Sequence, residues 1–171
     1  MKSIANATLL YITCLLLTSA TVQTKQQVYL QLVDPAGQPI RGTSVDRGYE
    51  RQIIATAFSG YTAGNSQLRF SMPSGSASAA LANLQGSGQK LPSAVFTITE
   101  PGEARPNVVS SVRLEDVAVK SVNDANGSTA VVLQASRIGV TYFQNNRKTG
   151  ERTVSGKTGY DFTTKQPWNS F

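Results

Sequence analysis

Apolar residues alternate with polar ones in short runs along most of this chain, and glycine, proline, asparagine or aspartate interrupts the runs at close intervals. Val28, Leu30 and Leu32 share one face of such a run, and residues 68–72 repeat the pattern. A period of two is typical of strands that bury one face. Because 171 residues suffice for one domain, we predict a single, mainly antiparallel β domain.

Further alternating runs predict strands over residues 53–59, 94–98, 108–122, 130–143 and 152–162, which gives seven to nine strands in all. In the two longest runs the apolar face changes side, near Glu115-Asp116 and again between Leu133 and Ile138. Such changes mark bulges or bends of a curled sheet. Asn126-Gly127 has the chemistry of a hairpin turn. Since closure removes exposed sheet edges, the expected fold is a closed or nearly closed antiparallel β-barrel.

One segment has helical spacing. Alanine and leucine recur at i, i+3, i+4 and i+7, at Ala77, Ala80, Leu81 and Leu84. Ser74 or Ser76 is predicted to cap this helix, and Gly86 is predicted to end it. A helix of this length is marginal alone, so we expect it to pack its apolar stripe on the outside or one end of the barrel. Gly156 and Gly159 are expected to form bulges in the last strand.

Two absences limit the chemistry. The chain has no histidine and one cysteine, Cys14, inside an apolar N-terminal run, so His-dependent nucleophiles, His metal sites and disulfides are excluded. Glu115 and Asp116 are neighbours on a strand and point to opposite faces, which prevents them from forming an acid/base pair. We predict a protein that is not an enzyme and binds no cofactor or metal.

The N-terminus has the features of a secretory leader. Lys2 provides a positive start, residues 9–17 an apolar segment, and Thr18-Ser19-Ala20 a cleavage site after Ala20. Residues 1–20 are therefore predicted to be a signal peptide, followed by a single domain over 21–171. A retained anchor is the alternative, although the apolar run is shorter than the roughly 20 residues that span a bilayer. We expect export to the periplasm or the extracellular space, without stable membrane insertion once the leader is removed.

The formal net charge is +6, and no segment carries the dense basic stripe of a nucleic-acid-binding protein. Arg147, Lys148 and Arg152 gather in one loop region, which is interpreted as a solvated hairpin tip or a contact for phosphate or lipid headgroups. Trp168 follows Pro167 in a tail too short for its own core, and packs either on the barrel or on a neighbouring subunit. Five aromatic residues within alternating runs are predicted to be core: Phe58, Phe70, Phe96, Phe143 and Phe162.

The order of these segments is similar to the haemolysin-coregulated protein (Hcp) family of type VI secretion systems, over residues 28–168. The segments that carry the resemblance are Val28-Tyr29-Leu30-Gln31-Leu32, residues 52–60, residues 68–71 with the helix 76–84, Gly88-Gln89-Lys90-Leu91-Pro92, Val112-Arg113-Leu114-Glu115-Asp116-Val117, and residues 138–143 followed by Lys157-Thr158-Gly159-Tyr160-Asp161-Phe162. The last two are the most specific.

The resemblance implies a barrel with one flanking helix that assembles into hexameric rings, and rings that stack into a secretion tube. The implied partners are copies of this chain, and the secretion spike, sheath or small effector proteins. Candidate subunit-interface residues are Tyr61, Asn65, Arg147, Lys148 and Trp168.

Two features differ from the family pattern: the leader, and a link over residues 60–66 that is shorter than the family's extended loop. The alternative function is a periplasmic or surface binding module that kept the barrel without tube assembly, with a ligand held by loops such as residues 33–50.

Overall fold

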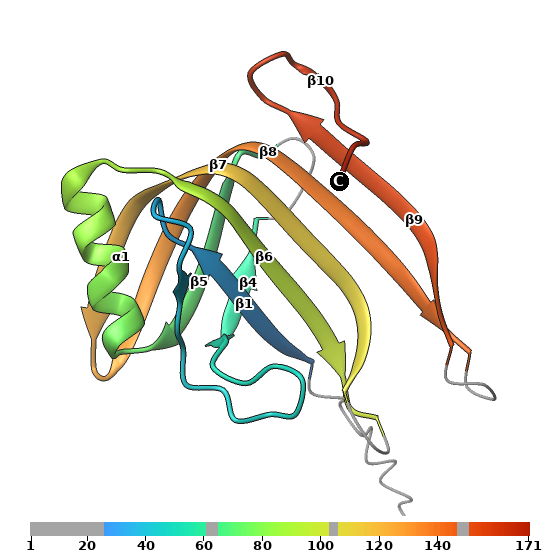
Figure 1. Ribbon diagram of the computed structural model, residues 1–171, viewed down its shortest axis with the longest axis horizontal. Coiled ribbons are helices and arrows are strands. Elements are labelled where there is room, and N and C mark those ends of the chain that lie inside the picture. Colours follow the sequence, from blue (N-terminus) through green and yellow to red (C-terminus); the bar gives the residue numbers. More distant parts are fainter. Residues whose placement is uncertain (1–25, 61–64, 103–105, 147–150) are drawn as a thin grey trace, which may run out of the picture.

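The computed structural model describes residues 26–60, 65–102, 106–146 and 151–171, which form a mainly β fold with one helix (Figure 1). The elements are β1 (Gln27–Val33), β2 (Pro39–Ile40), β3 (Ile53–Ala55), β4 (Ala57–Ser59), β5 (Gln67–Pro73), α1 (Ser76–Ser87), β6 (Leu91–Glu100), β7 (Asn107–Ala125), β8 (Ser128–Asn145), β9 (Arg152–Asp161) and β10 (Gln166–Pro167). The predicted leader lies outside the described residues. The predicted antiparallel sheet is confirmed.

The sheet follows the chain order through its middle. Strands β1, β6, β7, β8 and β9 are neighbours in space, and every pairing between them is antiparallel. Asn126 and Gly127 form the two-residue turn between β7 and β8, with φ of 51° and 76°. Positive φ at both positions is what the tightest hairpin turns require, so the turn prediction is confirmed.

The sheet curls strongly, as Figure 1 shows, but hydrogen bonds do not close it. One edge of β8 pairs with β5 over residues 128–134 and with β9 over residues 137–145. The short strands β3 and β4, on either side of Thr56, lie between the two ends of the roll. Strand β3 pairs with β1, whereas β4 pairs with β5. Strands β3 and β4 have three residues each, and each of them pairs with only one end of the roll. Closure into a hydrogen-bonded barrel is therefore not confirmed.

The predicted change of buried face is confirmed in both long strands. In β7 the buried positions run through Leu114 and resume at Val117, and in β8 they run through Ala135 and resume at Ile138. Between them Asp116 has φ 52° and accepts a hydrogen bond of 2.5 Å from the Ser136 hydroxyl. The two irregularities thus lie opposite each other and bend the sheet at one level.

The core lies inside the roll. Phe96 and Phe70 are buried there with ring centroids 5.4 Å apart, and the partly buried Phe58 packs on Phe96. Phe162 is partly buried against the same core, as predicted. The prediction for Phe143 is wrong. Phe143 comes three positions after the core residue Val140 in β8, so its side chain points to the outer face. There the Arg152 guanidinium carbon lies 4.7 Å from the centroid of the Phe143 ring.

The helix is confirmed, but its ends differ from the prediction. Gly75 is the N-cap of the helix. Its backbone amide donates a hydrogen bond to the Ser78 hydroxyl at 2.9 Å. The helix continues past Gly86 and ends at Gly88, which has the left-handed φ of 67°. Ala77, Leu81 and Leu84 are buried, and the side of α1 that carries them packs on β7.

Candidate subunit interface

The C-terminal segment 162–171, here called the hook, folds back on the outside of its own sheet. Strand β10 pairs with Tyr160 and Asp161 of β9, and the Trp168 amide donates to the Gly159 carbonyl at 3.0 Å. Trp168 is only 8% exposed and its ring contacts that of Phe171, with centroids 4.8 Å apart. Trp168 therefore packs on its own sheet, which is one of the two positions predicted for it.

A pair of glycines makes room for the hook. Gly139 of β8 is directly opposite Gly159 of β9. A Cβ on Gly139 would lie 2.6 Å from the Phe171 ring, and a Cβ on Gly159 would collide with the Trp168 carbonyl oxygen. The predicted bulge at Gly159 is wrong, because both glycines keep the pairing in register. The bulge lies beside Gly156, since Tyr142 pairs with Gly156 and Phe143 with Val154.

Charged side chains hold the hook from the other side. The Arg137 guanidinium lies 5.6 Å from the Trp168 ring centroid, 3.1 Å from Glu115 and 3.6 Å from Asp161. Asp161 also accepts hydrogen bonds from the backbone amides of Thr163 and Thr164, at 2.8 and 3.1 Å. These amides, with the Thr164 amide the largest cause, and the nearby Arg137 lower the pKa of Asp161. The Asp161 carboxylate thus helps to fix the turn at the start of the hook.

The outer halves of β8 and β9, residues 139–145 and 152–159, form what we call the wing. It extends to the side of the molecule away from α1 (Figure 1). Tyr142 is 45% exposed and Val154 is 55% exposed. In the part of the chain that the structure describes, no strand pairs with the outer edge of β9 between Arg152 and Thr158. The wing therefore exposes Tyr142 on one face and Val154 on the other, beside a strand edge without a ladder partner.

The structure describes two of the five predicted interface residues, Asn65 and Trp168. Tyr61, Arg147 and Lys148 lie outside the described residues. Asn65 is exposed and its side-chain oxygen accepts the Gln67 amide at 3.0 Å. The Ser66 carbonyl accepts the Ala135 amide, and the adjoining Ser136 carbonyl accepts the Phe162 amide, each at 2.9 Å. The region of Asn65 and the start of the hook therefore meet along β8.

The loop proposed for ligand binding is fixed against the sheet instead. Tyr29, fully buried on the outer face of β1, stacks on Tyr49 with centroids 4.0 Å apart. Its hydroxyl donates to Asp46 at 2.8 Å, and Gln27 donates to the same carboxylate at 3.2 Å. Burial, followed by this hydrogen bond, raises the pKa of Tyr29 above its ordinary value. The alternation of polar and apolar residues in β1 does not predict that Tyr29 is covered.

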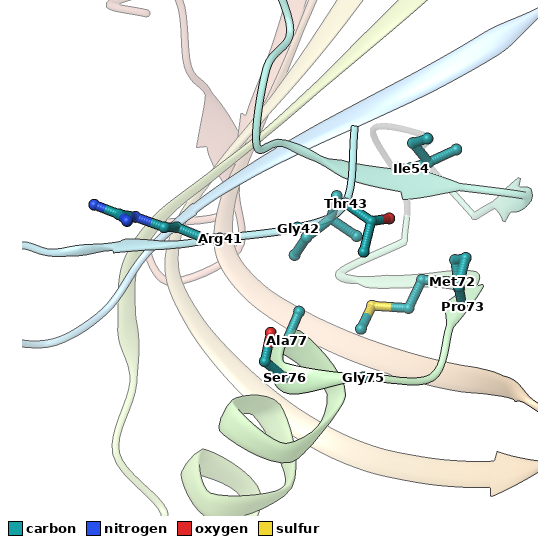
Figure 2. Close-up of a pocket in the computed structure, with 10 residues that line it drawn as sticks. Arg41, Gly42, Thr43, Ile54, Met72, Pro73, Gly75, Ser76 and Ala77 are labelled. Atoms are coloured by element: carbon teal, nitrogen blue, oxygen red, sulfur yellow. The ribbon is translucent and has the colours of Figure 1, made fainter. Parts of the chain in front are cut away.

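Two hollows lie near the helix. A cavity of about 20 Å³ lies where β3 and the loop before it meet the end of β5 and the start of α1 (Figure 2). Met72, Ala77 and Thr43 border it, and a space of this size holds about one water molecule. A shallow groove runs between the turn after β1 and α1, where Asp34 is the one ionisable lining residue.

The described residues contain no group of three His, Cys, Asp or Glu side chains that could hold a metal ion. In the same ranges, no helix is long and apolar enough to cross a membrane.

A rolled antiparallel sheet with a single helix and a long β7–β8 hairpin defines the class to which this fold belongs. Known structures of Hcp proteins share it, so the resemblance to that family is confirmed at the level of the fold. Hcp1 of Salmonella typhimurium superimposes with a TM-score of 0.65 at 20% identity, over 84% of this chain and 99% of that one.

Two further structures give the same result. A type six secretion system protein matches with a TM-score of 0.69 at 17% identity, over 84% of this chain and 100% of that one. The secreted protein Hcp3 of Pseudomonas aeruginosa matches with a TM-score of 0.61 at 16% identity, over 79% and 99% of the two chains. No family model and no curated protein sequence matches the chain.

Proposed function

We propose that this protein is a non-enzymatic structural or carrier protein that forms homo-oligomeric rings and works outside the cytoplasm. The observation that carries the proposal is the structural match, over 79–84% of this chain, to almost the full length of Hcp1, Hcp3 and a type six secretion system protein. Sequence identity below 25% defines the fold and leaves the function to be tested. The sequence has no histidine, and the described residues contain no group of three His, Cys, Asp or Glu side chains that could hold a metal ion, which supports a role for surfaces instead of a reactive site.

The wing is our proposed subunit contact. Val154 and Tyr142 are two of the three large apolar side chains that stand exposed in the described residues. Exposed apolar patches beside an unpaired strand edge are typical of association sites. A contact between the wing of one copy and a different surface of the next is heterologous, and such contacts close into rings when the rotation allows.

The five predicted interface residues fit this scheme by position. In the sequence, Arg147 and Lys148 lie between β8 and β9, the two strands of the wing, whereas Tyr61 and Asn65 lie between β4 and β5. Trp168 is buried in the hook of its own chain, where its ring contacts that of Phe171. In the proposed oligomer we therefore assign it the role of holding the hook in place. A hexamer, and binding to a spike, a sheath or small effector proteins, remain predictions from the family.

Export through the leader is the second part of the proposal. It rests on Lys2, the apolar run 9–17 and the small residues before residue 21. The charge that this removes is one lysine, so the exported domain stays basic. An exported ring would act as a carrier or surface component in its own compartment.

Light scattering coupled to size-exclusion chromatography tests the rings, on the full chain and on residues 21–171. We expect a mass that is a multiple of the monomer and annular particles in negative-stain images. A monomer at every concentration would contradict the ring. Mass determination of the N-terminus after cell fractionation tests export, and an intact Met1 in cytosolic protein would contradict it.

A further inference from the structure

The tip of the β7–β8 hairpin carries an asparagine in a sequence that no part of the proposed assembly uses. Asn126-Gly127-Ser128 is an Asn-x-Ser triplet, the acceptor signal for N-linked glycans in exported proteins. Asp124, two positions earlier, supplies the acidic residue that the bacterial form of this signal carries. The other such triplet in the chain, Asn6-Ala7-Thr8, falls within the predicted leader.

The structure presents this triplet at the surface. Six consecutive residues from Asn123 to Ser128 are exposed, and Asn126 stands at the first position of the two-residue turn with φ 51°. Among the described residues, none hydrogen-bonds to the Asn126 side-chain amide. A glycan on Asn126 therefore displaces no packed side chain.

The backbone beneath the tip is fixed. The Gly127 carbonyl accepts the Ser74 amide at 3.0 Å, and the Ser74 hydroxyl donates to Asp124 at 3.1 Å. The tip therefore lies beside the start of α1, on the side of the molecule away from the wing (Figure 1). A bulky, hydrated glycan here covers the rim next to the helix and leaves the wing itself uncovered.

We propose that Asn126 is an N-glycosylation site, an inference that rests on the proposed export. The side-chain nitrogen of Asn126 forms a bond to C1 of the reducing-end sugar of a lipid-pyrophosphate-linked oligosaccharide. The bond between C1 and the pyrophosphate oxygen breaks, and the lipid pyrophosphate leaves with the electron pair. The amide proton passes through the transferase to solvent. Transfer precedes closure of the hairpin, since Asp124 is held by Ser74 once the chain has folded.

The test expresses the full chain in a bacterial host that carries an oligosaccharyltransferase and its lipid-linked oligosaccharide. We expect the intact mass to rise by one glycan, and the tryptic peptide of residues 121–137 to carry it. Ser128→Ala is expected to lose the added mass, and Ser128→Thr to keep it, while both retain the Asn-Gly turn. Asn83→Gln removes an exposed asparagine outside any triplet and is expected to keep the glycan.

The outcomes separate this inference from the proposed export. Protein with a processed N-terminus and an unmodified 121–137 peptide would overturn the glycan and leave export intact. Unprocessed protein would contradict export. In that case the same chain with residues 1–20 replaced by an established export leader decides, and an unmodified peptide there would also overturn the inference. Added mass that persists in Ser128→Ala would assign the sugar to another residue.

Discussion

Gly139 and Gly159 face each other across β8 and β9, and the ring of Phe171 lies over both of them. The pair exists because a side chain at either position would occupy the space of the hook. At Gly159 the obstacle is backbone, the Trp168 carbonyl and the Ile138 carbonyl, whereas at Gly139 it is the Phe171 ring. Backbone yields less easily than a side chain, so the two positions differ in tolerance.

We therefore expect Gly159→Ala to lower the free energy of unfolding by about 1–3 kcal/mol, the usual cost of an overfilled site, and Gly139→Ala by less. Denaturant titration measures this, and the emission of Trp168, the single tryptophan, reports on the hook directly. Gly156→Ala is the matched control, because its nearest neighbour would be Tyr142 at 3.9 Å. Equal stability of Gly159→Ala and Gly156→Ala would refute this account of the hook.

Acid should weaken the fold in part through two aspartates. The hydrogen bond from Lys90 and that from Ser136 lower the pKa of Asp116, and backbone amides lower that of Asp161. A carboxylate with a lowered pKa stabilises the fold above its unfolded pKa of about 3.9, and this contribution is lost as the pH falls through the folded pKa.

Asp116→Asn and Asp161→Asn are therefore each expected to flatten the decline of unfolding free energy below about pH 4. Urea titrations across the acid range provide the measurement. Salt serves as a control, because it screens the exposed Lys90–Asp116 pair and affects the amide contacts of Asp161 less. An unchanged acid slope in both variants would remove these groups from the explanation.

Alkali should act through Tyr29. Since its folded pKa is raised, its contribution to stability is full below the unfolded pKa of about 10 and is lost as the pH rises above it. Tyr29→Phe is expected to cost about 1 kcal/mol at neutral pH, the usual value of one hydrogen bond, and to reduce the alkaline loss. Phenolate absorbance during a pH titration checks this, and ready ionisation of Tyr29 in the folded state would contradict it.

Assembly should depend on the wing. Val154→Glu adds a charge to an exposed apolar position, and we expect it to shift the oligomer toward monomer while unfolding free energy changes by no more than about 0.5 kcal/mol, as for other surface substitutions. Val45→Glu is the matched control, because Val45 is 89% exposed in a loop far along the chain from β9. Light scattering on both variants decides, and equal oligomers would exclude Val154 from the contact.

The sequence allows the strands, the helix and the bend of the long hairpin to be predicted because these depend on local periodicity. The phase change near Asp116 is visible in the order of apolar residues, and the structure has it at the same position. The core prediction for Phe143 is wrong because this residue lies beyond the second phase change, where the buried face is the one that carries Ile138 and Val140.

The hook and the covered face of β1 were not predictable in the same way. Phe171 meets Gly139 across more than thirty positions of chain, and neither residue shows that contact in its neighbours. Tyr49 covers Tyr29 through a loop with no periodicity. The setting of Trp168 in the sequence marks it as unusual, and the structure shows it packed on its own sheet.

The exchange of partners at Thr56 leaves the roll with a seam. Around the rest of its circumference, ladders of hydrogen bonds fix the spacing of the strands, whereas at the seam the amide and the hydroxyl of Thr56 both donate to the Ser71 carbonyl of β5. At this level a single residue, and not a ladder, connects the two ends of the roll.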